Sequence, residues 1–368
     1  METRIKREYG ITLHYQIRKE IEKYIKENNF TDKPLPQEEK LAKIFNVSRG
    51  TVRRAILDLV NQGVLYRISG KGTFVNKKTL SIEKITIFSP WQLHKELEIA
   101  QNTYEDILIK ELRKVITKNG YTIILKNLEK EEIEFAETTK ESNGIIILNP
   151  YRNQKNIIKR VSKFSIPAVF IGANLERKDV NYVASDNKMG IKIAVDYLIS
   201  TGHKYLFFIG GSPESFDTYE RYKEFLNYCK ERKIKASASV FDSNLNWQNE
   251  TQKLLLDILK LKKLPDAFIT GGITLSLYLI EAIRKAGKLI PDDFSLIGFD
   301  DFPICSHLNP PLTTISQPID LLAKNGFDLL KKEMKKLSLK KEQIILPLKL
   351  VIRDSCKRRE VMEYEGKI

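Results

Sequence analysis

The first 75 residues change from helical to strand periodicity. Apolar residues recur every three or four positions over residues 13–27, 37–45 and 49–62, which predicts three amphipathic helices. Gly63 ends the third helix, and residues 64–75 hold two short apolar runs around a glycine-containing turn, which predicts a hairpin. Three helices followed by a hairpin are the pattern of a winged helix-turn-helix.

After residue 84, short continuous apolar runs alternate with longer helical segments. The expected strands are residues 85–88, 121–125, 144–148, 167–171, 204–210, 239–242, 266–270 and 295–299. The expected helices include residues 104–118, 187–200, 216–232 and 275–286. Continuous apolar runs indicate parallel strands buried on both faces. Because about eight such strands exceed one compact sheet, we predict an α/β domain of two doubly wound lobes, with a ligand at the carboxyl ends of the strands.

The two patterns are separated by a polar stretch without apolar periodicity. We therefore expect a winged-helix domain (1–76), a linker (77–84), a two-lobed domain (85–356) and a polar tail (357–368).

Positive charge is concentrated in the first of these segments. The net charge is +15, and residues 1–80 hold 17 Lys and Arg against 9 Asp and Glu, which leaves +7 for the other 288 residues. A basic domain joined to a nearly balanced one is typical of nucleic-acid binding, although solubility also favours excess positive charge.

The start of the third helix carries three arginines. Ser48 is a suitable N-cap, and Arg49, Arg53 and Arg54 follow within the first turn and a half. Cations are disfavoured at a helix N-terminus by roughly 0.3–1 kcal/mol each. In a helix-turn-helix, however, this end enters the major groove, and arginine suits both guanine and phosphate. We expect Arg49 and Arg53 to read the groove and Arg54 to contact the backbone; the alternative is a solvated basic face.

Two further features suit close contact with DNA. Gly50 lies opposite the apolar stripe of the third helix and allows close approach. Gly70 and Gly72 permit a tight hairpin turn around Lys71, whose cation and neighbouring backbone N–H groups can meet phosphate or the minor groove.

Residues 35–75 resemble the winged-helix domain of the gluconate-repressor (GntR) family of bacterial regulators. The resemblance rests on the proline before the second helix, on "VSRGTVRRA", and on "GVLYR" leading to "GKGTFV". It implies groove-reading roles for Arg49, Gly50, Thr51 and Arg53, and places the wing-tip glycine at Gly70. Two residues depart from the family's "LPSERELA": Gln37 replaces the serine that caps the second helix, and Glu39 replaces an arginine that usually contacts phosphate.

The second domain is similar to the sugar-sensing core of the lactose and galactose repressors (LacI/GalR), which is related to periplasmic binding proteins. The resemblance is carried by residues 183–211, 220–225, 291–301 and 310–318, and spans about residues 84–354. A winged helix of the first kind joined to a core of the second resembles the arabinose-repressor subgroup. It implies three crossovers between the lobes, near residues 184–187, 313–317 and 337–343.

The same resemblance implies an effector site between the lobes. It nominates Arg221 and Asp300, whose guanidinium and carboxylate both suit a polyol. The other nominated residues are Trp247 as an apolar wall, Ser89 and Asn149. Each has an alternative interpretation: Arg221 as a surface arginine, Asp300 as a turn cap and Trp247 as part of the lobe core.

Three positions lack the polar groups that the family usually places near its ligand. Gly272 and Ile273 stand where an Asn-Asp pair is expected, and Gly172 where a carboxylate or amide is expected. Fewer polar groups imply a larger ligand, a less polar one, or a site that no longer binds sugar.

Several classes of protein are not indicated. No run of about 18 apolar residues could span a membrane, and the N-terminus lacks the apolar stretch of a signal peptide, so we expect a cytoplasmic protein. The three cysteines lie far apart, and no catalytic triad, phosphate-binding loop or metal-ligand cluster is evident. We therefore expect no enzymatic activity, cofactor or metal.

Together these patterns predict a homodimeric repressor that binds a double-stranded DNA operator and responds to a small carbohydrate. The alternatives are a solute-binding protein with a basic appendage, and a regulator whose effector is not a sugar.

Overall fold

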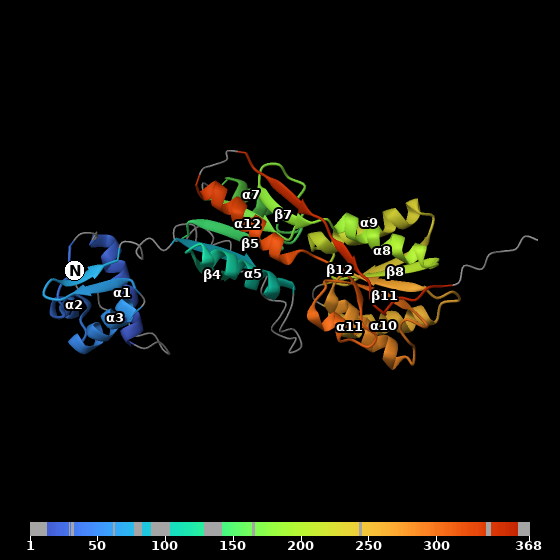
Figure 1. The fold of residues 1–368 in the computed structure, drawn as a ribbon, viewed down its shortest axis with the longest axis horizontal. Coiled ribbons are helices and arrows are strands. Elements are labelled where there is room, and N and C mark those ends of the chain that lie inside the picture. Colours follow the sequence, from blue (N-terminus) through green and yellow to red (C-terminus); the bar gives the residue numbers. More distant parts are fainter. Residues whose placement is uncertain are drawn as a thin grey trace, which may run out of the picture. The chain divides into compact units, whose positions relative to one another are not determined.

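The computed structural model describes residues 13–28, 30, 33–61, 63–76, 83–89, 104–128, 142–163, 166–242, 245–335 and 340–359 (Figure 1). The contacts divide the chain into two units, Met1–Glu83 and Lys84–Ile368, and each is treated by itself. Most of the predicted linker, residues 77–82, and most of the predicted tail, residues 360–368, lie outside the described residues. The predicted segment boundaries therefore stay predictions.

The first unit is a winged helix-turn-helix, as predicted. Its elements are α1 (Leu13–Asn28), α2 (Glu38–Phe45), α3 (Arg49–Asn61), β1 (Leu65–Ile68) and β2 (Gly72–Val75). The two strands pair antiparallel from Leu65 opposite Val75 to Ile68 opposite Gly72. Apolar residues of all three helices and of the hairpin form one core, which includes Ile21, Leu41 and Ile56. This core holds α3 by its apolar side and leaves the opposite side exposed.

The turn between α2 and α3 is fixed by both helix ends. Asn46 at the end of α2 has the left-handed φ of 52°, and the Val47 amide donates to the Ala42 carbonyl. The Ser48 hydroxyl accepts the Thr51 amide at 3.1 Å, which confirms Ser48 as the N-cap of α3.

The second unit contains two six-stranded sheets. The first has the order β13-β7-β6-β5-β3-β4, with every pair parallel. Its strands are β3 (Lys84–Ser89), β4 (Thr122–Asn127), β5 (Gly144–Leu148), β6 (Ala168–Ile171), β7 (Asn181–Ser185) and β13 (Gln343–Leu346). Helices α5 (Tyr104–Lys118) and α12 (Ile319–Met334) pack in one apolar cluster with the sheet, while α7 (Lys155–Lys163) packs in another.

The second sheet has the order β14-β12-β11-β10-β8-β9, and only its edge strand β14 is antiparallel. Its strands are β8 (Tyr205–Gly210), β9 (Lys235–Val240), β10 (Ala267–Thr270), β11 (Ser295–Phe299), β12 (Thr313–Ser316) and β14 (Lys349–Val351). Helices α8 (Asn187–Ser200) and α9 (Phe216–Glu231) cover one face. Helices α10 (Trp247–Leu259) and α11 (Ile273–Lys285) cover the other. The predicted two-lobed α/β architecture is confirmed (Figure 1).

The chain passes between the two sheets three times. The first two passages follow β7 and β12, at the predicted places. The third prediction, residues 337–343, is wrong: β13 first adds a strand to the first sheet beside β7, and the passage lies between Leu346 and Lys349. A second correction concerns residues 239–242, because the strand is Lys235–Val240. Its small residues, "KASASV", do not form the apolar run by which the other strands were recognised.

Candidate functional site

The exposed side of α3 presents two arginines that the other described residues of the unit leave unengaged. Arg53 and Arg54 are exposed, and neither forms an ion pair with another described residue. A Cβ at Gly50 would meet only the Ser48 hydroxyl, at 3.8 Å, so the surface is open there. Thr51 is half-buried, and its hydroxyl is 2.8 Å from that of Ser48. All four were predicted from the sequence to contact DNA, and these roles stay predictions.

Arg49, in contrast, is engaged by α2. Its Nη1 donates to Glu39 Oε1 at 2.8 Å, and its Nε lies 3.7 Å from Glu38 Oε2. Glu38 also accepts from Arg67 Nη2 of β1, at 3.0 Å. The two glutamates therefore connect the start of α3 with the second helix and the wing. The sequence showed that Glu39 departs from the family, but not that its carboxylate reaches Arg49.

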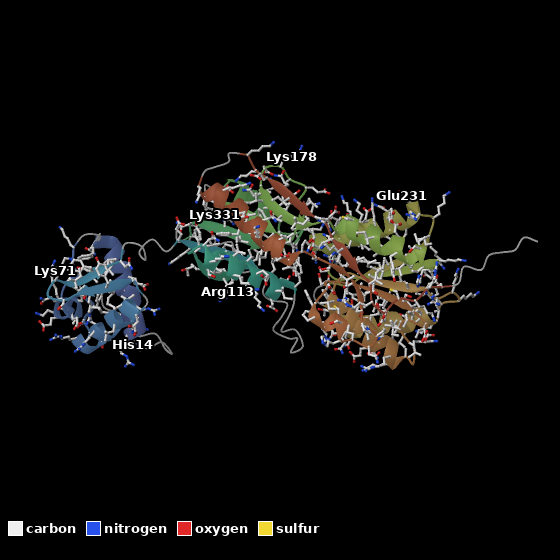
Figure 2. The ribbon with its side chains drawn as sticks, viewed as in Figure 1. His14, Lys71, Arg113, Lys178, Glu231 and Lys331 are labelled. Carbon is white, nitrogen blue, oxygen red and sulfur yellow. The ribbon has the colours of Figure 1, made fainter. Side chains whose placement is uncertain are left out.

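The hairpin turn has the geometry that its glycines predict. Gly70 and Gly72 have φ values of 74° and 110°, which L side chains rarely adopt. Lys71 between them is exposed at the tip (Figure 2). The Leu35 amide donates to the Thr73 carbonyl at 2.7 Å, so the hairpin is tied to the segment before α2. The tip thus offers a cation on a fixed support.

In the second unit, Arg221 is a buried arginine held by hydrogen bonds and by an aromatic ring. It is 4% exposed, its Nε donates to Asn187 Oδ1 at 2.7 Å, and its Nη1 donates to the Gly271 carbonyl at 2.7 Å. The guanidinium also lies 4.0 Å from the centre of the Phe299 ring. The interpretation of Arg221 as a surface arginine is therefore wrong.

Asp300 connects the two lobes through Gln317. It follows β11, has a φ of 72° and is 6% exposed. Its Oδ1 accepts from Gln317 Nε2 at 2.6 Å, while Gln317 Oε1 accepts from the Ser185 hydroxyl at 2.6 Å. Ser185 ends β7 of the first sheet, and Gln317 follows β12 of the second. The hydrogen-bonded chain therefore runs across the first two passages between the lobes.

Acidic groups outnumber cations around Arg221. Asn187 Nδ2 donates to Asp217 at 2.9 Å and to Glu220 at 3.1 Å, and Asp217 lies 3.7 Å from Arg221 Nη2. Burial raises the pKa of Asp217 to about 6, against the opposing effect of Arg221. Burial also raises the pKa values of Asp300 and Glu220. Arg221 does not compensate for the desolvation of Asp217 and Asp300, and Lys188, 3.8 Å from Glu220, does not compensate for that of Glu220. These carboxyl groups are therefore suited to accept hydrogen bonds from a ligand.

The first lobe contributes Tyr104 to the same cluster. Its hydroxyl is buried with no hydrogen-bond partner among the described residues. Burial raises the pKa of Tyr104 well above its ordinary value, and Asp217 and Asp300 raise it further. These carboxylates come from the second lobe, so the tyrosine faces them across the lobes. Sequence reasoning missed Tyr104, although its place at the start of a predicted helix was visible.

Asn149 belongs to the first lobe's part of the site. It follows β5 with a φ of 40°, and its Nδ2 donates to Glu105 Oε1 at 3.2 Å. Its Oδ1 is buried and has no partner among the described residues. An ideal Cβ at Gly172, where φ is 89°, would lie 1.8 Å from this oxygen. The missing side chain at Gly172 is thus explained, because the Asn149 amide fills its place.

Gly272 is open, in contrast to Gly172. A Cβ there would meet only Asp300 Oδ2, at 3.8 Å, so a side chain would fit beside the cluster. Gly272 precedes α11 and provides no side-chain cap. The polar group expected at this position is absent, and no described side chain is packed into its place.

The two remaining nominated residues have no hydrogen bond to the cluster among the described residues. Trp247 is half-buried beside the core of the second lobe, and its indole N–H donates to the Asp242 carbonyl at 2.9 Å. Its ring covers Gly211, where a Cβ would lie 2.7 Å away. Ser89 is buried at the end of β3. The packing interpretation therefore fits Trp247, and its role as a ligand wall stays a prediction, as does that of Ser89.

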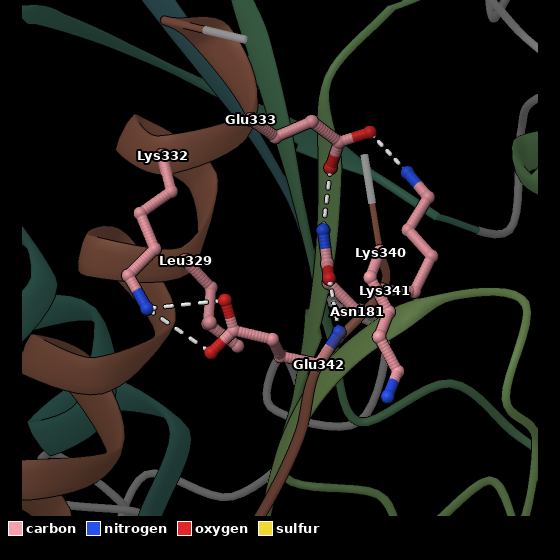
Figure 3. Close-up of a pocket in the computed structure, with 7 residues that line it drawn as sticks. All are labelled: Asn181, Leu329, Lys332, Glu333, Lys340, Lys341 and Glu342. Atoms are coloured by element: carbon pink, nitrogen blue, oxygen red, sulfur yellow. Dashed lines mark hydrogen bonds and ion pairs between the residues drawn. The ribbon is translucent and has the colours of Figure 1, made fainter. Parts of the chain in front are cut away.

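A small hollow elsewhere in the first lobe is lined by residues that pair with one another (Figure 3). Seven residues line it: Asn181, Leu329, Lys332, Glu333, Lys340, Lys341 and Glu342. Glu333 accepts from Asn181 at 2.6 Å and pairs with Lys341, while Lys332 pairs with Glu342 at 3.0 Å. Its volume of about 10 Å³ holds about one water. These pairs join α12 to β7 and to the residues just before β13, and they leave no room for an effector.

Comparison with known proteins identifies both units. Residues 13–75 match the bacterial regulatory proteins of the gntR family, and residues 195–356 match the periplasmic binding protein-like domain. The chain thus joins a gntR-type helix-turn-helix domain to a periplasmic-binding-protein-like domain. In the described part of this regulator, no helix is long and apolar enough to cross a membrane, and no three His, Cys, Asp or Glu residues are grouped as a metal site.

Individual relatives agree with this assignment. The arabinose metabolism transcriptional repressor of Geobacillus stearothermophilus is 26% identical over 374 aligned positions, covering 95% of this chain and 99% of the relative. The ribose operon repressor of Halalkalibacterium halodurans is 27% identical over 267 positions, covering 71% and 78%. The Lac repressor dimer bound to operator and an anti-inducer has the same fold, with a TM-score of 0.64 at 21% identity, over 75% of this chain and 94% of that one.

These curated relatives are transcriptional repressors rather than enzymes. The protein is accordingly a DNA-binding transcriptional repressor whose second domain is periplasmic-binding-protein-like.

Proposed function

We propose that this repressor binds a near-palindromic operator as a homodimer and releases it when a small neutral carbohydrate, such as arabinose or a related pentose, binds between the lobes of the second unit. It would act in the cytoplasm, where bacterial DNA lies. The proposal for dimers draws on the similar fold of the operator-bound Lac repressor dimer. Two recognition helices would then enter major grooves about 34–36 Å apart.

The DNA-binding part of the proposal assigns a role to each exposed group on α3 and the wing. Arg49 and Arg53 read base edges, Arg54 and Lys71 contact phosphates, and Gly50 lets the helix approach. The unpaired state of Arg53 and Arg54 in the described structure supports this division, since both are free to meet DNA.

The effector proposal is carried by one observation: a buried polar cluster, centred on Arg221 and Asp300, receives groups from both lobes. Arginine offers several fixed donors, and carboxylates accept from hydroxyls, so the cluster suits a polyol. Its acidic excess disfavours a phosphorylated or carboxylated ligand, because a further buried anion would be repelled. The unpaired Tyr104 hydroxyl and Asn149 oxygen supply one further donor and one further acceptor.

Control of DNA binding requires the effector to favour one arrangement of the lobes. A ligand that contacts residues of both lobes binds their closed arrangement better than an open one. To switch the protein almost fully, its affinity for the two arrangements must differ by roughly 5 kcal/mol.

A thermal-shift screen of the full-length protein tests the ligand class. Neutral pentoses and hexoses should raise the melting temperature, since a ligand that binds only the native fold stabilises it by mass action. Matched sugar phosphates and uronates should give smaller shifts. Stabilisation by anionic compounds alone would instead favour the alternative that the effector is not a neutral sugar. The further alternative, a solute-binding protein, predicts a response to sugar without specific operator binding.

A further inference from the structure

The contact between Glu39 and Arg49 places a carboxylate on the surface proposed to meet DNA. The two side chains are 67% and 62% exposed, and Arg49 Nη1 donates to Glu39 Oε1 at 2.8 Å. Exposed ion pairs of this kind contribute little to folding stability, because water and salt screen them. A carboxylate beside DNA also repels phosphates. Neither stability nor affinity for DNA in general accounts for Glu39 at this position.

The pair changes what Arg49 can do. Glu39 engages Nη1, and Glu38 lies 3.7 Å from Nε, so two anions surround the guanidinium before any DNA arrives. Glu38 is itself held by Arg67, at 3.0 Å, and is only 21% exposed. A guanidinium held in this way is less attractive to phosphate, yet it needs less ordering to meet a base edge. Arg53 and Arg54 form no such pair in the described part of the unit.

We propose that Glu39 is a specificity-determining positioning residue, which holds Arg49 ready for the O6 and N7 edge of a guanine and lowers the affinity of this surface for non-operator DNA. The proposal rests on the role of Arg49 in the proposed function. Discrimination then arises partly from a carboxylate that does not contact DNA. Its negative charge near the phosphates weakens DNA binding, and this loss is compensated only in complexes where Arg49 contacts a base.

The test uses full-length protein and a duplex selected by it from a random pool. Affinities for this duplex and for an unrelated duplex are measured over a salt series for wild type, Glu39→Gln, Arg49→Ala and the double variant. Glu22→Gln, on α1, is the matched control for the loss of one negative charge. Thermal unfolding verifies that each variant is folded.

Glu39→Gln should raise the affinity for unrelated DNA and lower the ratio of specific to non-specific affinity by about tenfold, within the range that one bidentate base contact supplies. Changing one G·C pair of the selected duplex to A·T should weaken wild-type binding by a similar factor and affect Glu39→Gln much less. In the Arg49→Ala background, Glu39→Gln should leave the ratio unchanged. Glu22→Gln should leave it unchanged in any background.

Two results would overturn the proposal. If Glu39→Gln changes both affinities equally, as Glu22→Gln does, Glu39 acts only as a general charge. If Glu39→Gln lowers the ratio of specific to non-specific affinity as much in Arg49→Ala as in wild type, Glu39 does not act through Arg49. A third result, an unchanged ratio in Arg49→Ala alone, would remove Arg49 from base reading and thereby refute the role on which this proposal rests.

Discussion

The three arginines at the start of α3 differ in their surroundings although they share one helix end. Arg49 is held by two glutamates, while Arg53 and Arg54 are exposed and unpaired among the described residues. Cations near a helix N-terminus cost roughly 0.3–1 kcal/mol each in the free protein. The nearby carboxylates reduce this cost for Arg49, and phosphates would reverse it for the other two.

Arg53→Ala should weaken operator binding by roughly 1–3 kcal/mol and relax the preference at one base pair, since the side chain reads a base edge. Arg54→Ala should instead weaken binding to all sequences alike and reduce the salt slope by about one. Gel-shift titrations at several salt concentrations distinguish these results. An unaltered ratio of specific to non-specific affinity in Arg53→Ala would make that arginine a phosphate contact.

Asp217 should make the second unit more stable as the pH falls. Its folded pKa of about 6 lies above its ordinary value, so ionisation destabilises the fold above that pH, and the penalty is lost as the group is protonated below it. Asp217→Asn should therefore be more stable than wild type near pH 8, by up to about 3 kcal/mol, with a gap that narrows towards pH 5. Urea titrations across this range measure the gap.

The prediction compares wild type with a variant because the titration of His203 also changes the stability of the protein with pH, in the opposite direction. Burial lowers its pKa, so its contribution to stability falls as the solution becomes acidic. Asp328→Asn, at an exposed carboxylate within α12, controls for the lost charge. A gap between wild type and Asp217→Asn that stays constant with pH would show that Asp217 is not destabilised by burial.

Only part of the candidate site was visible from sequence. Arg221 and Asp300 lie in motifs and could be nominated from a resemblance. Asn187 and Gln317 also lie in such motifs but were not nominated, and neither was Asp217. The role of each depends on contacts between residues 17 to 34 positions apart in the chain. Tyr104 lies in the first lobe and comes near these residues only because the two lobes pack face to face. The fold, rather than any local pattern, assembles these residues.

At the scale of elements, the helices were predicted better than the strands. Residues 104–118 and 187–200 are helical at the expected bounds, and the buried residues inside each helix recur every three or four positions. Strands β7, β12, β13 and β14 were not among the expected strands: β7 and β12 mix polar with apolar residues, and β13 and β14 are short edge strands. Edge strands are buried on fewer sides, so their sequences carry a weaker signal.

The N-cap of α2 can be used to test the effect of Gln37, which stands where the family has a serine. Gln37 occupies the N-cap but makes no side-chain hydrogen bond to the helix. Gln37→Ser should stabilise α2 by roughly 0.5–1 kcal/mol, because serine satisfies a free backbone amide. Hydrogen exchange of the α2 amides in the full-length protein measures this effect. Gln37→Ala should give no such protection, and equal protection in both variants would exclude capping as the cause.

The loop after β6 should tolerate no side chain. Gly172→Ala should destabilise the second unit by more than Gly120→Ala. Both glycines have left-handed φ values, but only at Gly172 would the added Cβ clash, at 1.8 Å from the Asn149 oxygen. Strain at positive φ alone costs roughly 1 kcal/mol, and the clash adds to it. Denaturant titrations compare the two, and adding Asn149→Ala to Gly172→Ala should recover the difference. Equal losses in the two glycine variants would mean that Asn149 moves aside freely.

At the scale of the whole molecule, the sequence indicated the architecture but not the effector. Apolar runs and turn residues repeat along the chain, so two lobes and a winged helix could be recognised. Ligand choice depends instead on a few side chains, and here Gly172 and Gly272 replace groups that the family usually supplies. The acidic excess around Arg221 became visible only in the folded protein, and it is the reason for proposing a neutral ligand.

The central claim is that a ligand bound at Arg221 and Asp300 controls DNA binding. The most direct measurement is operator affinity at fixed salt, with and without the sugar that stabilises the protein best, in wild type and in Asp300→Asn. The sugar should weaken operator binding by wild type at least about tenfold and leave Asp300→Asn unaffected, while the two proteins bind operator equally without sugar. Equal weakening in both proteins, or none in wild type, would contradict the claim.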